Sequence, residues 1–177
     1  MSGQSTDPDA IRDQLEALHR ESFAWASVCC AGHSIEADDV LQMTYLKILD
    51  GRACFEGRSA FKTWLFGVIR MTAREQQRRA WWRWLRRAPV EDAAGQPAAD
   101  ASPEDAAMRS ESIERVRAAC ARLPERQREV LMLVFHHDLG LDEAAAVMGV
   151  SPGSARKHYQ RGKDQLRAWL GRNLSNA

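Results

Sequence analysis

The side chains best suited to bind another molecule lie near the C-terminus, at Arg156, Lys157, Gln160 and Arg161. All four can donate hydrogen bonds to the edges of DNA bases and to backbone phosphates. Their position in a short basic stretch predicts contact with duplex DNA. The alternative is a helix whose basic face only contacts solvent.

The residues around this basic stretch have the spacing of a helix-turn-helix. Ala145 is small enough to let two helices approach closely, and Gly149 tolerates the left-handed backbone that a tight turn requires. Ser151 can cap the second helix, Pro152 suits its first position, and Ala155 completes the spacing. Because the turn and the basic positions coincide, the pattern favours DNA binding.

No motif of the sequence is typical of an enzyme. The patterns GxSxG, HExxH, GxxxxGK[ST] and GxGxxG are absent. The run 136–138 (His-His-Asp) has no nucleophile at hand and is predicted to be a solvated turn. Cys29, Cys30 and His33 make a thin set of metal ligands without a second cluster. We therefore expect buried, reduced thiols, no metal, no cofactor and no enzymatic activity.

The near-zero net charge of +1 hides a strong segmental pattern. Residues 1–50 hold three basic and nine acidic residues, whereas residues 51–90 hold ten basic and two acidic ones. Residues 91–110 are acidic again, and the tail from Ser151 has six basic residues against Asp164. This pattern indicates two contact surfaces for a polyanion and a third surface for a basic partner.

Apolar residues at three- and four-residue steps predict helices throughout, and no stretch alternates for long enough to form a strand. We expect one helix at about 9–30, a second from Ser34 to Asp50, and a third from about Ser59, its N-cap, into the eighties. The buried stripe expected for the second helix is Ile35, Val40, Leu41, Tyr45, Ile48 and Leu49. The cations expected on the outer faces of the third helix are Lys62, Arg70, Arg74, Arg78 and Arg79.

The second half of the chain predicts further helices. One is expected near 108–122, and Pro124 suits the first turn of another that runs through Phe135. Residues 89–105 are rich in Ala, Pro and acids without apolar periodicity, which is typical of a linker. The chain is therefore expected to form two small helical domains.

A membrane-spanning segment is not expected. The longest run without Lys, Arg, Asp or Glu in the N-terminal half has about 14 residues, whereas a spanning helix needs roughly 18–20. The polar and acidic start, MSGQSTDPDA, does not have the pattern of a secretory signal. A cytoplasmic location with reduced thiols is the expectation.

Two blocks of the sequence resemble the sigma-70 family of RNA polymerase sigma factors. EADDVLQMTYLKIL followed by FEGRSAFKTWLFGVIRMTAREQQRR is similar to region 2, and residues 120–170 are similar to region 4. A short chain with only these two regions resembles the extracytoplasmic-function (ECF) type. The resemblance implies an all-α fold with a region 2 bundle at 9–88, a flexible linker at 89–107 and a region 4 helix-turn-helix at 108–172.

The resemblance also implies which side chains contact which partner. Asp38, Asp39 and Gln42 would bind core RNA polymerase, although both aspartates could instead serve as capping charges at a helix start. The residues implied for the single-stranded −10 element are Phe55, Arg58, Phe61, Lys62, Trp64, Arg70, Met71 and Arg74. Those implied for the duplex −35 element are Ser154, Arg156, Lys157, His158, Gln160 and Arg161.

Three features leave alternatives open. Trp64 also fits the buried stripe of its helix, and packing in the core is favoured for it over base contact. Met71 stands where many family members carry Asn, which predicts a shifted or weaker −10 preference. The segment AWWRWLRR could cover the core, pack between domains, or contact DNA or a partner; its tryptophans are Trp81, Trp82 and Trp84.

The implied function is transcription initiation, with core RNA polymerase, promoter DNA and an anti-sigma factor as partners. The alternative is a stand-alone helix-turn-helix regulator that never contacts polymerase. Such a regulator would have no use for the acidic helix that contains Asp38 or for the aromatic and basic block after it. A bundle that only binds proteins would leave both basic blocks unexplained.

Overall fold

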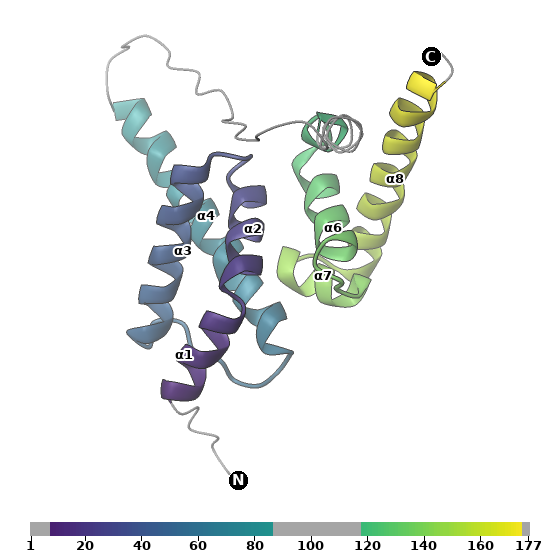
Figure 1. The fold of residues 1–177 in the computed structure, drawn as a ribbon. Coiled ribbons are helices and arrows are strands. Elements are labelled where there is room, and N and C mark those ends of the chain that lie inside the picture. The colour runs from purple at the N-terminus through teal and green to yellow at the C-terminus, as the bar shows by residue number, and fades with distance from the viewer. Residues whose placement is uncertain (1–7, 87–117, 175–177) are drawn as a thin grey trace, which may run out of the picture. The chain divides into compact units, whose positions relative to one another are not determined.

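The computed structural model describes residues 8–86 and 118–174 of the 177-residue chain (Figure 1). All regular elements in these two ranges are helices, which confirms the all-α prediction. Backbone contacts divide the chain into two compact units, Met1–Pro97 and Ala98–Ala177. The predicted linker at 89–107 and most of the helix expected near 108–122 lie outside the described residues.

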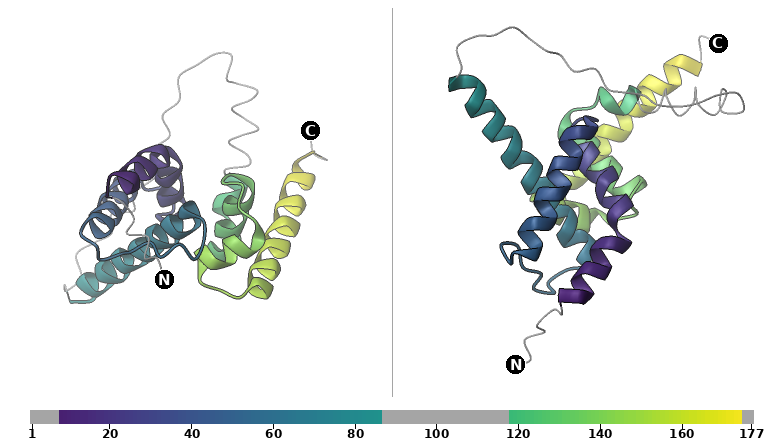
Figure 2. Two further views of the ribbon diagram at one scale, coloured as in Figure 1. Left: turned by 90° about the horizontal axis from the view of Figure 1, so that it is seen from below. Right: turned by 60° about the vertical axis from the view of Figure 1, so that its left-hand side comes forward.

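The first unit contains four helices: α1 (Pro8–Ala17), α2 (His19–Cys29), α3 (Ser34–Leu49) and α4 (Phe61–Arg86). Helices α2, α3 and α4 pack against one another, and α1 contacts α2 (Figures 1 and 2). The ring of Trp25 stacks on that of Phe66 at 5.9 Å between centroids, and its Nε1–H donates to the Phe66 carbonyl at 3.0 Å. This bond satisfies the one polar atom of a fully buried indole.

The prediction of one helix at about 9–30 is wrong, because the helical conformation is interrupted between α1 and α2. Leu18 has φ −96° and ψ 3°, outside the helical range. The apolar spacing continues across this break, with Leu15 buried before it and Trp25 buried after it. The periodicity alone therefore did not reveal it.

Helix α3 begins and ends within about one residue of the predicted bounds, but its buried face is different. Val40, Leu41 and Ile48 are buried as expected, whereas Ile35 is 80% exposed and Leu49 is also exposed. Thr44 takes a core position because its hydroxyl donates to the Val40 carbonyl at 2.8 Å, one turn back. The expected inclusion of Ile35 and Leu49 in the buried stripe is wrong.

Helix α4 starts one residue later than expected from Ser59 as the N-cap. The Trp64 amide bonds to the Ala60 carbonyl at 3.1 Å, so Ala60 occupies the N-cap position, and the Ser59 hydroxyl donates to that same carbonyl instead of capping the helix. Leu65, Phe66 and Ile69 form its buried face. The last turns of α4 extend past α3 (Figures 1 and 2).

The described part of the second unit contains α6 (Glu125–Phe135), α7 (Leu141–Met148) and α8 (Pro152–Leu174), each packed on the other two. Residues 118–121, just before α6, are also helical. Pro124 was expected in the first turn of α6, but it is the N-cap residue, immediately before the helix. None of the helices in the described ranges is both long and apolar enough to cross a membrane.

Helices α7 and α8 form the predicted helix-turn-helix. Gly149 adopts the left-handed conformation with φ 62°, and the Ser151 hydroxyl accepts the Ser154 amide at 3.2 Å as an N-cap. Ala145 and Ala155 are both buried, as their small size predicted. His137, expected in a solvated turn, is instead buried beside α6.

Candidate nucleic-acid and protein interfaces

One face of α3 is exposed and acidic. Asp38, Asp39 and Gln42 all face solvent, on the side of the helix opposite Ala37, Val40 and Leu41. Exposed apolar residues flank them at three- and four-residue steps, namely Ile35, Leu46 and Leu49. We call this set of six residues the α3 outer face. Its mixture of carboxylates and apolar side chains suits a basic protein surface with apolar pockets.

Three aromatic rings gather where the loop 51–60 meets α4. Phe55 lies 5.2 Å from Phe61 and 5.3 Å from Trp64, and the latter two are 5.3 Å apart, between ring centroids. All three are half-buried. Trp64 therefore belongs to neither the fully buried core nor the open surface. We call this set the aromatic cluster; it leaves ring surface available for stacking with unpaired bases.

The cations predicted around the aromatic cluster differ in their surroundings. Arg58 is exposed and pairs with Glu56, and Lys62 pairs with Glu21 at 2.5 Å. Arg74 is half-buried. Arg70 is only 4% exposed, so the prediction that it lies on an outer face of α4 is wrong.

Met71 and the residues around it are held by a link between α3 and α4. Met71 itself is 72% exposed. Lys47 Nζ bonds Glu75 Oε2 at 2.7 Å and Thr72 Oγ1 at 3.2 Å, and Glu75 Oε1 accepts Arg79 at 2.6 Å. The hydrogen bond and charge of Lys47 lower the pKa of Glu75 below its usual value. This link fixes the register of α4 against α3 next to Met71.

The basic positions predicted at the start of α8 lie on its exposed side. Arg156, Lys157, Gln160 and Arg161 are exposed, and Arg156 lies 3.5 Å from Asp142 of α7. Ser154 and His158 are half-buried, and the Ser154 hydroxyl lies 2.9 Å from that of Ser151. The helix-turn-helix thus presents the four donors together, in the arrangement with which such a motif enters the major groove.

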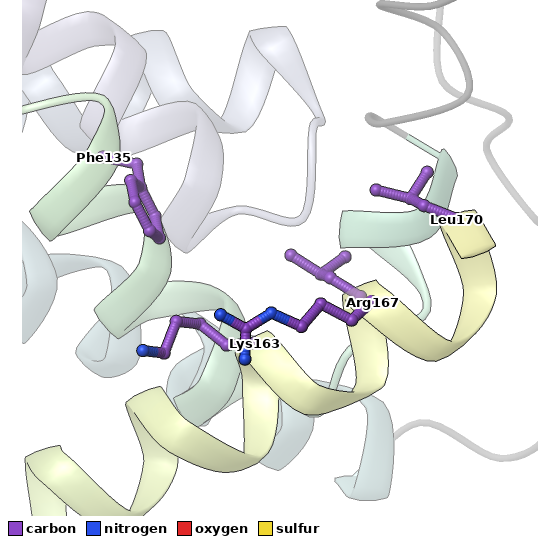
Figure 3. Close-up of a pocket in the computed structure, with 5 residues that line it drawn as sticks. Phe135, Lys163, Arg167 and Leu170 are labelled. Atoms are coloured by element: carbon purple, nitrogen blue, oxygen red, sulfur yellow. The ribbon is translucent and has the colours of Figure 1, made fainter.

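A shallow apolar groove of about 410 Å³ lies between the end of α6 and α8 (Figure 3). Phe135 forms one side, at 63% exposure, and stacks on Tyr159 at 5.8 Å. Leu166 and Leu170 line it along α8, together with the cations Lys163 and Arg167. This groove was not predicted from the sequence. The position of Phe135 at the very end of a helix, followed by a polar turn, does favour an exposed ring.

The thiols are free and differ in burial. Burial raises the pKa of Cys30 to about 11 and also raises that of Cys120, so both stay protonated at neutral pH. Cys54 is exposed, contrary to the expectation of buried thiols. Within the described ranges, no group of three or more His, Cys, Asp or Glu residues is placed to hold a metal ion.

Trp81 does not cover the core. Its side chain is 58% exposed near the end of α4. The side chains of Trp82 and Trp84 lie outside what the structure describes. The interpretation that this segment covers the core is therefore wrong for Trp81.

Comparisons with known proteins agree with this arrangement. Residues 15–83 match Sigma-70 region 2, and residues 113–166 match Sigma-70, region 4. The chain is 32% identical to the ECF RNA polymerase sigma factor EcfG of Rhodopseudomonas palustris over 92% of this chain and 86% of that protein. It is 24% identical to the ECF RNA polymerase sigma factor SigW of Bacillus subtilis, over 93% and 90% of the two chains.

Two solved structures share the fold. The sigma factor RpoE from Bartonella quintana, in complex with the anti-sigma factor NepR, has a TM-score of 0.68 at 23% identity, over 91% of this chain and 96% of that one. CnrH, in complex with the cytosolic domain of CnrY, has a TM-score of 0.63 at 24% identity, over 96% and 92%.

The order of the two matched regions and the near-complete coverage of a relative above 30% identity settle the family. A transcription initiation factor of this kind is not itself an enzyme. The chain belongs to the sigma-70 family as an ECF sigma factor, with region 2 followed by region 4, and directs RNA polymerase to promoters.

Proposed function

We propose how the work of this sigma factor is divided along the chain. Residues 9–88 bind core RNA polymerase and the −10 element, residues 108–172 bind the −35 element, and residues 89–107 link them. The charge pattern supports this division, because the acidic and the two basic blocks fall in separate parts of the chain.

The −10 element, in this proposal, is held as a single strand at the aromatic cluster. Phe55, Phe61 and Trp64 supply stacking surfaces, and Arg58, Lys62 and Arg74 supply charge for the backbone; Arg70 supports the helix from inside. Stacking of a base on an aromatic side chain contributes about 1–3 kcal/mol. The exposed Met71, two turns beyond Trp64 on α4, cannot hydrogen-bond a base as Asn does, which supports a weaker or shifted preference at one position.

The −35 element is read by α8 in the major groove. Arg156, Lys157, Gln160 and Arg161 donate to base edges and phosphates, with Ser154 and His158 at the margin of the contact. Exposure of the four donors at the start of the second helix of the helix-turn-helix supports this assignment.

The observation that carries the polymerase assignment is the exposed, acidic α3 outer face. We expect the purified chain to co-elute with sigma-free core RNA polymerase from a sizing column. Asp39→Arg should abolish co-elution, because it places a cation against a basic partner surface. Asp13→Arg, the same charge reversal at an exposed position of α1, should leave co-elution intact.

Each outcome of this experiment is informative. Co-elution that survives Asp39→Arg would show that polymerase binds another surface. Failure of the unaltered chain to associate, with good binding of duplex DNA, would favour the stand-alone regulator.

We also infer that an anti-sigma factor holds this chain inactive. The sigma factor RpoE, which shares the fold, is solved with the anti-sigma factor NepR bound, and CnrH, which also shares it, is solved with the cytosolic domain of CnrY. In this chain, the groove beside Phe135 combines an apolar floor with Lys163 and Arg167, which suits an amphipathic segment with acidic residues. The cytoplasm, where RNA polymerase acts, is the proposed location.

Phe135→Asp tests the anti-sigma proposal, because it places a carboxylate in the apolar groove. In the native host, the variant should raise activity of a reporter promoter without any inducing signal, while transcription with purified core polymerase stays unchanged. Full activity of the unaltered chain without a signal would contradict regulation by an anti-sigma factor. Loss of transcription in the purified system would show that the groove serves polymerase instead.

A further inference from the structure

A single carboxylate lies among the cations of α8. Between Pro152 and Leu174 the sequence contains six Lys and Arg residues, and Asp164 is its one acidic residue. A carboxylate near DNA repels phosphates and so weakens binding. Asp164 is exposed on the helix proposed to read DNA, so we expect its carboxylate to make a contact whose benefit outweighs this loss of affinity.

Asp164 fixes the amide group of Gln160. Nε2 of Gln160 donates to both oxygens of the Asp164 carboxylate, at 3.1 and 3.4 Å, one helical turn away. Because a carboxylate only accepts hydrogen bonds, the amide must turn its nitrogen toward Asp164 and leave its carbonyl oxygen pointing elsewhere. Arg167 Nη1 lies 3.5 Å from the same carboxylate and holds it from the next turn.

The amide group of Gln160 lies on the side of α8 that carries the other residues proposed to bind DNA. Lys157, Gln160, Asp164 and Arg167 recur at steps of three and four, and all are exposed. Ala155 and Gly162 lie on the opposite, buried side of the helix. Gln160 therefore meets the groove with its amide orientation already set.

The orientation decides which bases the side chain accepts. A freely rotating glutamine can offer either a donor or an acceptor to a base. With its NH2 group directed to Asp164, Gln160 has its carbonyl oxygen fixed on the other side of the amide, and this oxygen accepts from the amino group of adenine or cytosine in the major groove. The oxygens that guanine and thymine present there are acceptors and leave this carbonyl unpaired.

We propose that Asp164 is a positioning residue that sets the base preference of Gln160 in the −35 element. It acts through Gln160 and does not itself contact a base. The proposal rests on the proposed function, in which α8 reads the −35 element.

The test uses the full chain assembled with core RNA polymerase and a promoter library randomised across the −35 element. The unaltered chain should prefer adenine or cytosine at one position by about 3- to 10-fold, the range expected for one hydrogen bond. Asp164→Ala should reduce this preference below about twofold, while overall affinity stays equal or rises because a negative charge is lost. A purely structural role would lower affinity for all sequences alike.

Two further variants make the test specific. Asp142→Ala removes another exposed carboxylate, the one beside Arg156, and should leave the preference at the Gln160 position intact. In a Gln160→Ala background, Asp164→Ala should change the preference no further. An unchanged preference in Asp164→Ala, with sequence-selective binding retained, would overturn this inference alone. Absence of any −35 selectivity in the unaltered chain would instead overturn the proposed function.

Discussion

Glu75 of α4 forms ion pairs with cations on two helices. It accepts Lys47 of α3 on one oxygen and Arg79 on the other, and Lys47 also bonds Thr72. The link ties α3, the helix proposed to bind polymerase, to the helix that carries Met71. A loss of this link would weaken the attachment of α4 to α3 next to Met71, the residue proposed to alter the −10 preference.

The lowered pKa of Glu75 predicts how stability depends on pH. A carboxyl whose pKa is lower in the folded than in the unfolded state stabilises the fold above its unfolded value, and this contribution is lost as the pH falls through its folded value. For Glu75 the loss lies below its usual value of 4.5. We therefore expect Glu75→Gln to lower the free energy of unfolding at pH 7 and to flatten its decline below pH 4.5.

Urea unfolding of the chain at pH 7 and at a series of pH values below 4.5 measures both effects. Glu56→Gln is the matched control, since the ion pair of Glu56 with Arg58 is exposed and such pairs contribute little. Equal stability of Glu75→Gln and the unaltered chain at pH 7 would show that the link between α3 and α4 does not stabilise the fold.

At the scale of the element, two of the glycines of α8, Gly153 and Gly162, have opposite surroundings. Gly162 is buried against α6, and a Cβ there would lie 2.8 Å from Leu131 Cδ1 and 3.3 Å from Gln127 Cβ. A Cβ on Gly153 would meet no atom within 4 Å. Close contact between α6 and α8 thus depends on the absence of a side chain at 162.

The same substitution at these two positions should have opposite effects. Gly153→Ala should raise the free energy of unfolding by up to about 1 kcal/mol, because alanine favours a helix over glycine. Gly162→Ala gains the same propensity but overpacks the interface, which costs about 1–3 kcal/mol, so it should be less stable than the unaltered chain. Thermal unfolding of both variants measures the difference; stabilisation by Gly162→Ala would mean that Leu131 moves aside freely.

Helix α4 contains both core residues and residues proposed to bind DNA. Its core residues are Leu65, Phe66 and Ile69, and its first turn contributes Phe61 and Trp64 to the aromatic cluster. A rigid helix fixed by its buried side chains holds binding residues more accurately than a loop does. The loop 51–60 contributes only Phe55 to the cluster.

At the scale of the whole molecule, the division into two units predicts that each works alone. We expect residues 98–177 to fold and bind a −35 duplex, and residues 1–97 to co-elute with core RNA polymerase. In the 98–177 fragment, Arg161→Ala should weaken duplex binding by about 1–3 kcal/mol if Arg161 reads a base.

Circular dichroism measures whether the fragment folds, and duplex titration at fixed salt measures its affinity for DNA. Arg122→Ala, which removes an exposed arginine outside α8, serves as the control with a smaller expected loss. Salt must be held constant because phosphate contacts make affinity strongly dependent on it. A fragment 98–177 that is unfolded in isolation would contradict the proposed division.

Much of this architecture could be predicted from local sequence features. The left-handed Gly149, the Ser151 cap and the start of α8 at Pro152 depend on neighbours within a few residues, and so the helix-turn-helix was correctly predicted. The ends of α3 followed from Ser34 and Asp50 for the same reason. The exposure of the four donors on α8 was also predicted correctly, because the helix-turn-helix pattern itself leaves these positions at the start of its second helix exposed.

Burial, in contrast, was decided by the tertiary structure. Ile35 and Leu49 are apolar yet exposed, whereas Arg70 and His137 are polar yet buried. The difference depends on which sides of each helix the other helices cover, and the sequence of one helix does not contain that information. The sequence by itself thus determined the helices, their order and the family, while only packing determined which of their side chains are free to meet polymerase and DNA.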